Sequence, residues 1–103
     1  RFSRVLSKIP KSKGFIPIEK DQVSTEKNVI YLDLDELEAM RLVDGENLTQ
    51  DEAGSQMRIS RGSIWRLLQS CRKKLITAIY ENSEIRISFE ALEHATNSDA
   101  KTL

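Results

Sequence analysis

Hydrophobic positions that cluster or alternate over a few residues predict two short strands. Residues 28–32 (NVIYL) are β-branched and aromatic, and residues 85–89 (IRISF) alternate between apolar and polar side chains. Both patterns are typical of strands. The two segments flank the helical part of the chain, so we expect them to pair and to tie its ends together.

Apolar side chains at helical spacing predict a first helix over residues 33–45. Asp33 or Asp35 supplies its N-cap, acidic residues fill its first turn, and Gly45 is a typical C-terminal residue. Leucines provide most of its apolar side. Its acidic side, within residues 35–44, is either a solvated face or a docking surface for a partner.

Two further helices follow, with a short break between them. Thr49 and Glu52 form a capping-box pattern, in which each side chain binds the backbone N–H of the other residue. The break begins at Arg58, and Ser60 can cap a third helix that runs to about Tyr80. This third helix has an apolar stripe at helical spacing, made of Ile64, Leu67, Leu68, Cys71, Leu75, Ala78 and Ile79.

Proline and glycine interrupt residues 1–27, which predicts an irregular basic arm at the N-terminus. We expect Phe15, Ile16 and Ile18 to pin this arm to the core. The arm is either a tail or a segment that enters a DNA minor groove. The chain is thus expected to have three parts: the arm at 1–27, a domain at 28–89 and a C-terminal tail at 90–103.

The composition is that of one small domain with a polar surface. The 103 residues are 39% hydrophobic and 31% charged, which allows a modest core and little room for a substrate cavity. One cysteine and one histidine exclude an internal disulfide and the usual zinc site. There is also no long apolar run and no glycine-rich phosphate loop. We therefore expect a cytoplasmic protein that is not an enzyme and uses no membrane, cofactor or metal.

Charge is segregated along the chain, although the formal net charge is zero. Residues 58–74 carry six basic residues and no acidic one, and most charges in residues 1–20 are also basic. Residues 33–52 carry eight acidic residues against one arginine. Such a segregated field can steer a polyanion such as nucleic acid.

The second and third helices, with the tight break between them, form a helix-turn-helix pattern. The small residues Ala53 and Gly54 suit the close crossing of its two helices. In such motifs the start of the second helix enters the major groove, where Arg suits guanine and Gln suits adenine. Base reading is therefore expected of Arg61, Trp65, Arg66 and Gln69. Contact with the DNA backbone is expected of Ser60, Ser63, Arg72, Lys73 and Lys74.

Two residues of the third helix have competing interpretations. Trp65 either contacts DNA or anchors the core or a dimer interface. Cys71 lies on the apolar stripe, which favours a buried and unreactive thiol.

Three stretches carry a resemblance to a known family: LDLDELEAMRL at 32–42, LTQDEA at 48–53, and Ser60-Arg61. They resemble a small prokaryotic family of uncharacterised, predicted DNA-binding proteins. The helix-turn-helix of that family is similar to region 4 of the sigma factors of RNA polymerase. The resemblance covers roughly residues 29–87 and implies DNA binding, without a known operator, ligand or enzyme activity.

The fold that this resemblance implies is mainly α. It is a three-helix helix-turn-helix of the sigma region 4-like, winged-helix or homeodomain-like class, with a short two-stranded β pair.

The chain departs from the family's pattern in three places. Arg58 stands at the turn where Gly is usual, and a non-Gly residue in left-handed geometry costs on the order of 1 kcal/mol. Gly62 stands where Pro is common, which loosens the start of the third helix. The arm lacks the cysteines that many relatives carry, so no metal role is carried over.

Sequence-specific binding of double-stranded DNA, in transcriptional regulation, is the favoured function. A homodimer is expected because one short recognition helix supplies little contact. The alternative is a protein-interaction module that docks RNA polymerase or another partner through residues 35–44. Salt dependence separates the two, because binding to duplex DNA weakens steeply with salt.

Overall fold

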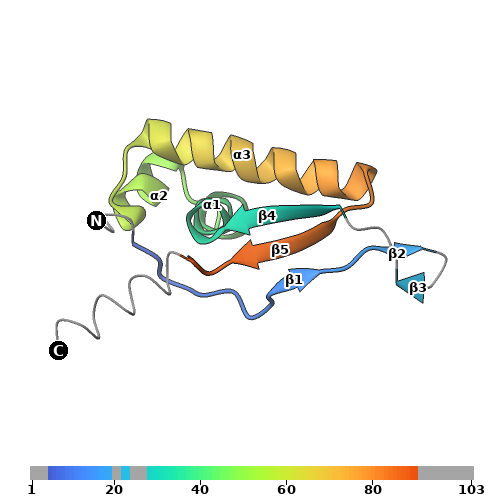
Figure 1. The fold of residues 1–103 in the computed structure, drawn as a ribbon. Helices are drawn as coiled ribbons and strands as arrows, with labels where there is room; N and C mark the ends of the chain where they lie inside the picture. The colour runs from blue at the N-terminus through green and yellow to red at the C-terminus, as the bar shows by residue number, and fades with distance from the viewer. Residues whose placement is uncertain (1–4, 20–21, 24–27, 91–103) are drawn as a thin grey trace, which may run out of the picture.

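The computed structural model describes residues 5–19, 22–23 and 28–90. Within them, helices lie on one side of a small mixed sheet (Figure 1). The elements run in the order β1 (Gly14–Phe15), β2 (Ile18–Glu19), β3 (Gln22–Val23), β4 (Val29–Asp33), α1 (Leu34–Met40), η1 (Arg41–Gly45), α2 (Gln50–Met57), α3 (Arg61–Tyr80) and β5 (Glu84–Ser88). The protein is thus mainly helical, as predicted, and the predicted tail lies almost wholly outside the described residues.

The first helix begins at the predicted cap and changes type before its predicted end. Asp33 and Glu36 form a capping box, in which the Asp33 N–H donates to the Glu36 carboxylate over 3.0 Å. After Met40 the chain continues as the π-helical turn η1, which ends at Gly45. The helical segment therefore has the predicted length but not a single α-helical geometry.

The caps predicted for α2 and α3 are both present. Thr49 and Glu52 form a reciprocal capping box at the start of α2. The Ser60 hydroxyl accepts the Ser63 N–H over 3.1 Å at the start of α3. Each cap satisfies a backbone donor that the first helical turn leaves without a partner, which fixes where the helix begins.

Most of the apolar stripe of α3 faces the core, with one exception. Ile64, Leu68, Cys71 and Ala78 are buried, whereas Ile79 is 70% exposed. Ile79 follows Ala78 directly, so its side chain points about 100° further around the helix and away from the packed side. The prediction that Ile79 belongs to the buried stripe is therefore wrong.

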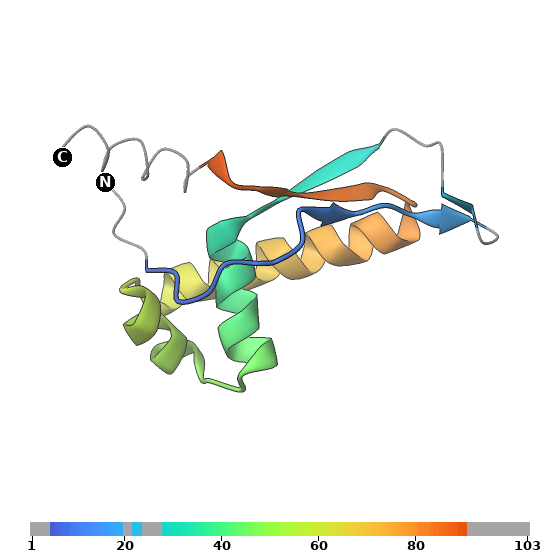
Figure 2. The same cartoon turned by 90° about the horizontal axis from the view of Figure 1, so that it is seen from below.

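The two predicted strands pair, and their pairing is parallel. β4 and β5 run side by side, with Ile30 opposite Ile85 and Leu32 opposite Ile87. A parallel pair needs a crossover connection, and the three helices provide it (Figure 2). The strand before the three helices is thus paired with the strand after them, as expected.

The N-terminal arm is more regular than predicted. β1 pairs antiparallel with β5 and gives a three-stranded sheet of order β1-β5-β4, while β2 and β3 form a second, two-stranded sheet. A side chain at Gly14 would collide with the Ile85 carbonyl oxygen, so glycine permits this close approach of β1. The prediction of an irregular arm missed these strands because each is only two residues long.

Hydrogen bonds, rather than the three apolar side chains named above, fasten the arm to the domain, and two of them join backbone groups. The Val5 N–H donates to the Met57 carbonyl over 3.0 Å, and the Ile87 N–H donates to the Lys13 carbonyl over 2.9 Å. Phe15 is 63% exposed, and the two isoleucines that follow it are exposed as well. The expectation that these apolar side chains pin the arm to the core is wrong.

The central core lies where α1, α2 and α3 meet. Its buried cluster consists of Ala39, Leu42, Ala53, Met57, Ile64 and Leu68. Within the described part of the chain, no helix is long and apolar enough to cross a membrane.

Candidate nucleic-acid interface

A short left-handed turn joins α2 to α3. Arg58 adopts φ 58° and ψ 43°, and the Ile59 N–H donates to the Gly54 carbonyl over 3.0 Å. A Cβ atom at Gly54 would lie 2.8 Å from the Ile59 oxygen, which is closer than such atoms normally approach. Glycine at this position therefore lets the turn fold tightly against α2 and sets the direction in which α3 leaves it.

The four predicted base-reading residues share one exposed face of α3. They follow one another by four, one and three residues, so they fall on the same side of the first helical turns. All four side chains are exposed: Arg61, Trp65, Arg66 and Gln69. The structure therefore brings the predicted set together on a surface that a ligand can reach.

Trp65 is 53% exposed and therefore does not belong to the core. An indole that is half exposed on a helix offers a flat apolar contact surface and one N–H donor. Of the two interpretations of Trp65, the exposure excludes an anchor in the core of its own domain.

Two serines surround the start of α3. Ser60 donates its hydroxyl proton to the Ser63 oxygen over 3.0 Å while it caps the helix. Arg66 reaches back to the same Ser63 oxygen over 3.5 Å. Arg61 approaches the exposed carboxylate of Asp51 at 3.8 Å, a distance typical of weak surface ion pairs. These polar groups form the end of α3 that lies next to the turn.

Arg58, in the turn itself, is an exposed cation that was not predicted as a site residue. It lies three positions before Arg61 and extends the basic surface beyond the N-terminus of α3. The only signal in the sequence was its membership of the basic run at residues 58–74.

The basic residues further along α3 already bind acidic residues of the first helical segment. Arg72 donates two hydrogen bonds, of 3.1 and 2.7 Å, to the Asp44 carboxylate. This bidentate contact holds the pKa of Asp44 below its usual value. Lys74 contacts Glu36 at 2.8 Å, whereas Lys73 lies exposed between the two paired cations.

Glu36 is buried and is held by groups from α3 and from the end of β4. It is only 2% exposed, and it accepts hydrogen bonds from Ser70 and Lys74 of α3, each of 2.8 Å, and from the Asp33 N–H. A buried carboxylate needs such partners to offset its lost hydration. Glu36 therefore fastens the middle of α3 to the start of α1.

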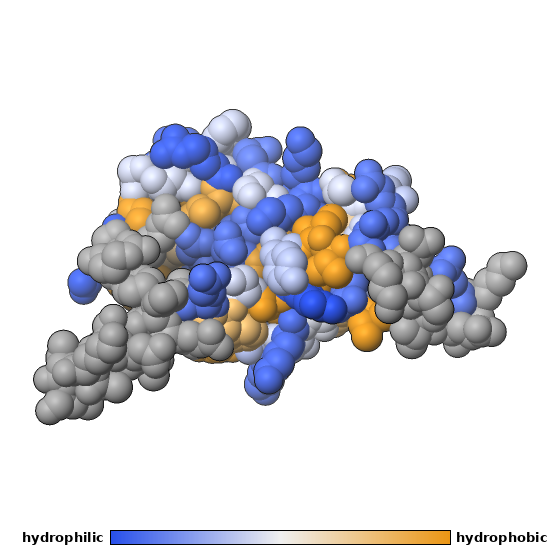
Figure 3. All heavy atoms as spheres, in the orientation of Figure 1, coloured by the Kyte–Doolittle hydropathy of each residue, from blue (hydrophilic) through white to orange (hydrophobic). Residues whose placement is uncertain are grey.

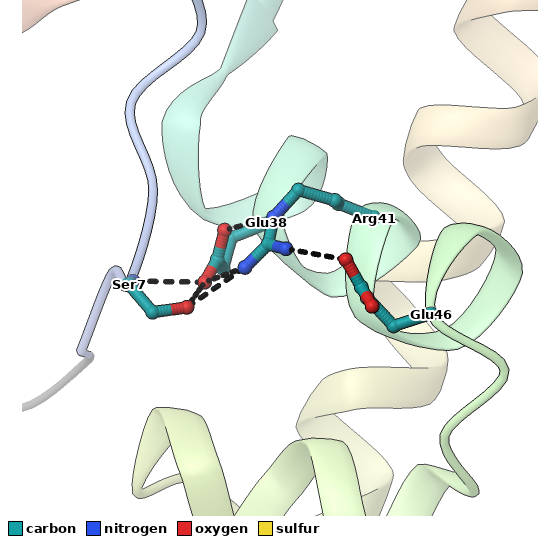
Figure 4. Close-up of polar contacts among 4 residues, drawn as sticks. All are labelled: Ser7, Glu38, Arg41 and Glu46. Atoms are coloured by element: carbon teal, nitrogen blue, oxygen red, sulfur yellow. Dashed lines mark hydrogen bonds and ion pairs between the residues drawn. The ribbon is translucent and has the colours of Figure 1, made fainter.

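A second buried carboxylate, Glu38, fastens the arm to α1 (Figure 4). It accepts the Ser7 N–H and hydroxyl over 2.9 and 2.6 Å, and two Arg41 donors over 3.0 Å each. Arg41 also contacts Glu46 at 3.2 Å. Burial alone would raise the pKa of Glu38, but the hydrogen bonds from Arg41 and Ser7 outweigh it and hold the pKa below its usual value.

The acidic side of the first helix is therefore not a plain solvated face. Glu36 and Glu38 are buried, and Asp44 is paired with α3. Three carboxylates of this segment therefore bind groups of their own chain.

A cleft of about 290 Å³ separates the start of α1 from α3 beside Arg66. Asp33 and Glu36 line one side, and burial together with the Glu36 charge raises the pKa of Asp33. Arg66 and Lys74 line the other side of this cleft, so Arg66 borders the carboxylates at the start of α1, whereas Trp65 and Gln69 do not line the cleft and are exposed.

These features define a small, mainly helical domain in which one helix presents a basic, exposed N-terminal half. The sequence matches the family described as "Protein of unknown function DUF134" over residues 1–94, and the chain belongs to this family.

Its relatives include UPF0251 proteins of archaea and clostridia. It is 43% identical to the UPF0251 protein TK0562 of Thermococcus kodakarensis over 84 residues, which are 82% of this chain and 74% of the relative. Identity to PF0620 of Pyrococcus furiosus is 42% over 84% of this chain and 80% of the relative. A UPF0251 protein of Clostridium beijerinckii is 42% identical over 77% of this chain, but only 52% of the relative's length is matched. No solved structure shows a significant match.

Proposed function

We propose that this protein binds double-stranded DNA in a sequence-specific manner and acts in transcriptional regulation. In this proposal α2 and α3 work as a helix-turn-helix, and the N-terminal half of α3 enters the major groove. The observation that carries the proposal is the tight turn at Arg58, which leaves a polar and basic face of α3 exposed directly after it.

The exposed face of α3 supports base reading by the four predicted residues. Arg61 and Arg66 match the paired acceptors of guanine, and Gln69 matches adenine. Trp65 would lie against sugars or thymine methyl groups, consistent with its half-exposed ring. Gly62, whose position has no atom nearer than 3.9 Å to an added Cβ, leaves room for close approach.

The roles proposed for the backbone-contacting residues divide into two groups. Ser60, Ser63 and Lys73, with Arg58 added, remain suited to phosphates. Arg72 and Lys74 instead hold α3 against the first helical segment, because their charges face Asp44 and Glu36. The phosphate contacts therefore gather around the turn and along the solvent side of α3.

The carboxylates at the start of α1 limit how a duplex can approach. Phosphates would be repelled from the inside of the cleft by Asp33 and Asp35, while Arg66 stands at the α3 side of that cleft. The duplex would therefore contact α3 from the face that carries Trp65. We do not propose docking of RNA polymerase through residues 35–44, because Glu36, Glu38 and Asp44 already bind their own chain.

A salt titration with matched arginine variants tests the proposal. Fluorescence anisotropy would follow the binding of a labelled mixed-sequence duplex by the wild type, Arg61→Ala, Arg66→Ala and Arg86→Ala. The wild-type affinity should fall steeply and linearly on logarithmic axes as salt rises. The two α3 variants should bind more weakly, while Arg86→Ala removes the same charge from β5 and should bind like the wild type. Salt-independent binding, or equal weakening by all three variants, would contradict the proposal.

A further inference from the structure

β4 forms an edge of the three-stranded sheet. β5 pairs with one side of β4, and no strand among the described residues pairs with its other side. We propose that this free edge binds the same edge of a second copy of the chain, in antiparallel orientation across a two-fold axis. Such a dimer would join two sheets into one and would not depend on DNA.

The register with β5 determines which backbone groups of β4 point outward. The Glu84 N–H donates to the Asn28 carbonyl over 2.8 Å, and Ile30 lies opposite Ile85. In a parallel ladder, alternate residues direct both their N–H and their C=O to the same neighbour. The backbone N–H and C=O groups of Asn28, Ile30 and Leu32 therefore point toward β5, and those of Val29 and Tyr31 point outward.

In one register of the two paired edges, every outward N–H and C=O group of Val29 and Tyr31 finds a hydrogen-bond partner on the other copy. With the two-fold axis at Ile30, Val29 of each copy lies opposite Tyr31 of the other, and both pairs exchange two hydrogen bonds. Aromatic and β-branched side chains are favourable cross-strand neighbours. An axis at Tyr31 would instead place Val29 opposite Asp33, whose N–H already donates to Glu36.

The free edge of β4 lacks the usual protection against pairing. Natural edge strands carry lysine, proline or a bulge that blocks association. β4 contains no lysine and no proline, its one charged residue is Asp33 at its end, and its pairing with β5 runs without a bulge. Tyr31 is 53% exposed, and hydrophobic surface gathers over β4 and β5 on this face of the molecule (Figure 3).

The size of the edge predicts weak association. Stable interfaces usually involve roughly 20–30 residues from each partner, many more than a five-residue strand provides. The free protein should therefore exchange between monomer and dimer. If the proposed function holds, a two-fold duplex site would strengthen the dimer by binding both copies at once.

Cysteine cross-linking tests the pairing and its register without DNA. At an axis on Ile30, the two Ile30 positions form a pair without hydrogen bonds, about 4.5 Å apart between Cα atoms, which suits a disulfide. Ile30→Cys, Tyr31→Cys and Ile18→Cys would be oxidised at equal concentration, with Ile18→Cys as the measure of random collision at an exposed site. Cys71 is buried and should not compete.

Ile30→Cys should give several-fold more disulfide-linked dimer than either control, and adding Tyr31→Lys should abolish the excess. Dimer yields for Ile30→Cys no higher than for Ile18→Cys would overturn the pairing, and a higher yield for Tyr31→Cys would overturn the register.

A second measurement keeps the proposal testable if Ile30→Cys does not fold. Sedimentation equilibrium at rising concentration should show an increase in average mass for the wild type and for Ile79→Lys, which places a charge on the exposed end of α3. The mass of Tyr31→Lys should stay that of a monomer. Equal behaviour of the two lysine variants, or a wild type that remains monomeric, would contradict the edge-strand interface.

Discussion

Gly54 sets the spacing between α2 and the turn, and its replacement by alanine isolates the energetic value of that contact. A Cβ atom at this position would lie 2.8 Å from the Ile59 carbonyl oxygen and 3.7 Å from the Ile64 side chain. The first distance cannot persist, so either the turn or the end of α2 must shift. Because the obstacle is backbone, no rotation of a side chain relieves it.

Two opposing terms determine the change in the free energy of unfolding for Gly54→Ala. Alanine in a helix gains about 1 kcal/mol over glycine. Forcing extra volume into a packed site costs about 1–3 kcal/mol. We therefore expect a net destabilisation of about 0–2 kcal/mol.

Gly62→Ala is a matched control for the helix-propensity term. An added Cβ at Gly62 has no neighbour nearer than 3.9 Å, so this variant should be as stable as the wild type or more stable. The difference between the two variants then reports the clash alone, about 1–3 kcal/mol. Urea unfolding followed by circular dichroism would measure both free energies. A Gly54→Ala protein as stable as Gly62→Ala would refute the close contact between α2 and the turn.

Three further predictions concern stability and the buried groups. Glu38→Gln should make the stability of the protein less sensitive to acid. In the wild type the Glu38 pKa is lowered from 4.5, so the ionised carboxylate stabilises the fold above that pH, and this stabilisation is lost as pH falls through the folded-state pKa. Equal acid sensitivity of the two proteins in thermal melts would count against the role of Glu38. Burial raises the Cys71 pKa to about 11, so a thiol reagent should label the native protein far more slowly than the unfolded one, and equal rates would place the thiol at the surface. Ser60→Ala removes the α3 cap and should lower the free energy of unfolding by about 1 kcal/mol in urea, and an unchanged midpoint would show that the cap is dispensable.

The helix starts could be predicted because their signals are local. Thr49 and Ser60 bind backbone groups only three residues away, and such short-range contacts leave a pattern in the sequence. The exposure of Arg61, Arg66 and Gln69 was predictable for the same reason, because the period of the apolar stripe fixes the opposite face, whereas the sequence left open whether Trp65 belongs to the core.

The buried charges could not be predicted, because their partners lie far along the chain. Glu36 meets Ser70 and Lys74, 34 and 38 positions away, and Glu38 meets Ser7, 31 positions away. The sequence shows a segregation of acidic and basic residues, but not which of them pair. That pairing is what separates Arg72 and Lys74, which bind the domain itself, from the cations placed around the turn.

Selection of bound duplexes from a random DNA pool, followed by sequencing, tests the central claim most directly. Full-length protein would be used beside Arg66→Ala. We expect the wild type to enrich a sequence motif, and Arg66→Ala to lose preference at one position with an affinity cost of about 1–3 kcal/mol. A two-fold repeat in the motif would agree with pairing through β4. Failure of the wild type to retain any duplex, even at low salt, would contradict DNA binding.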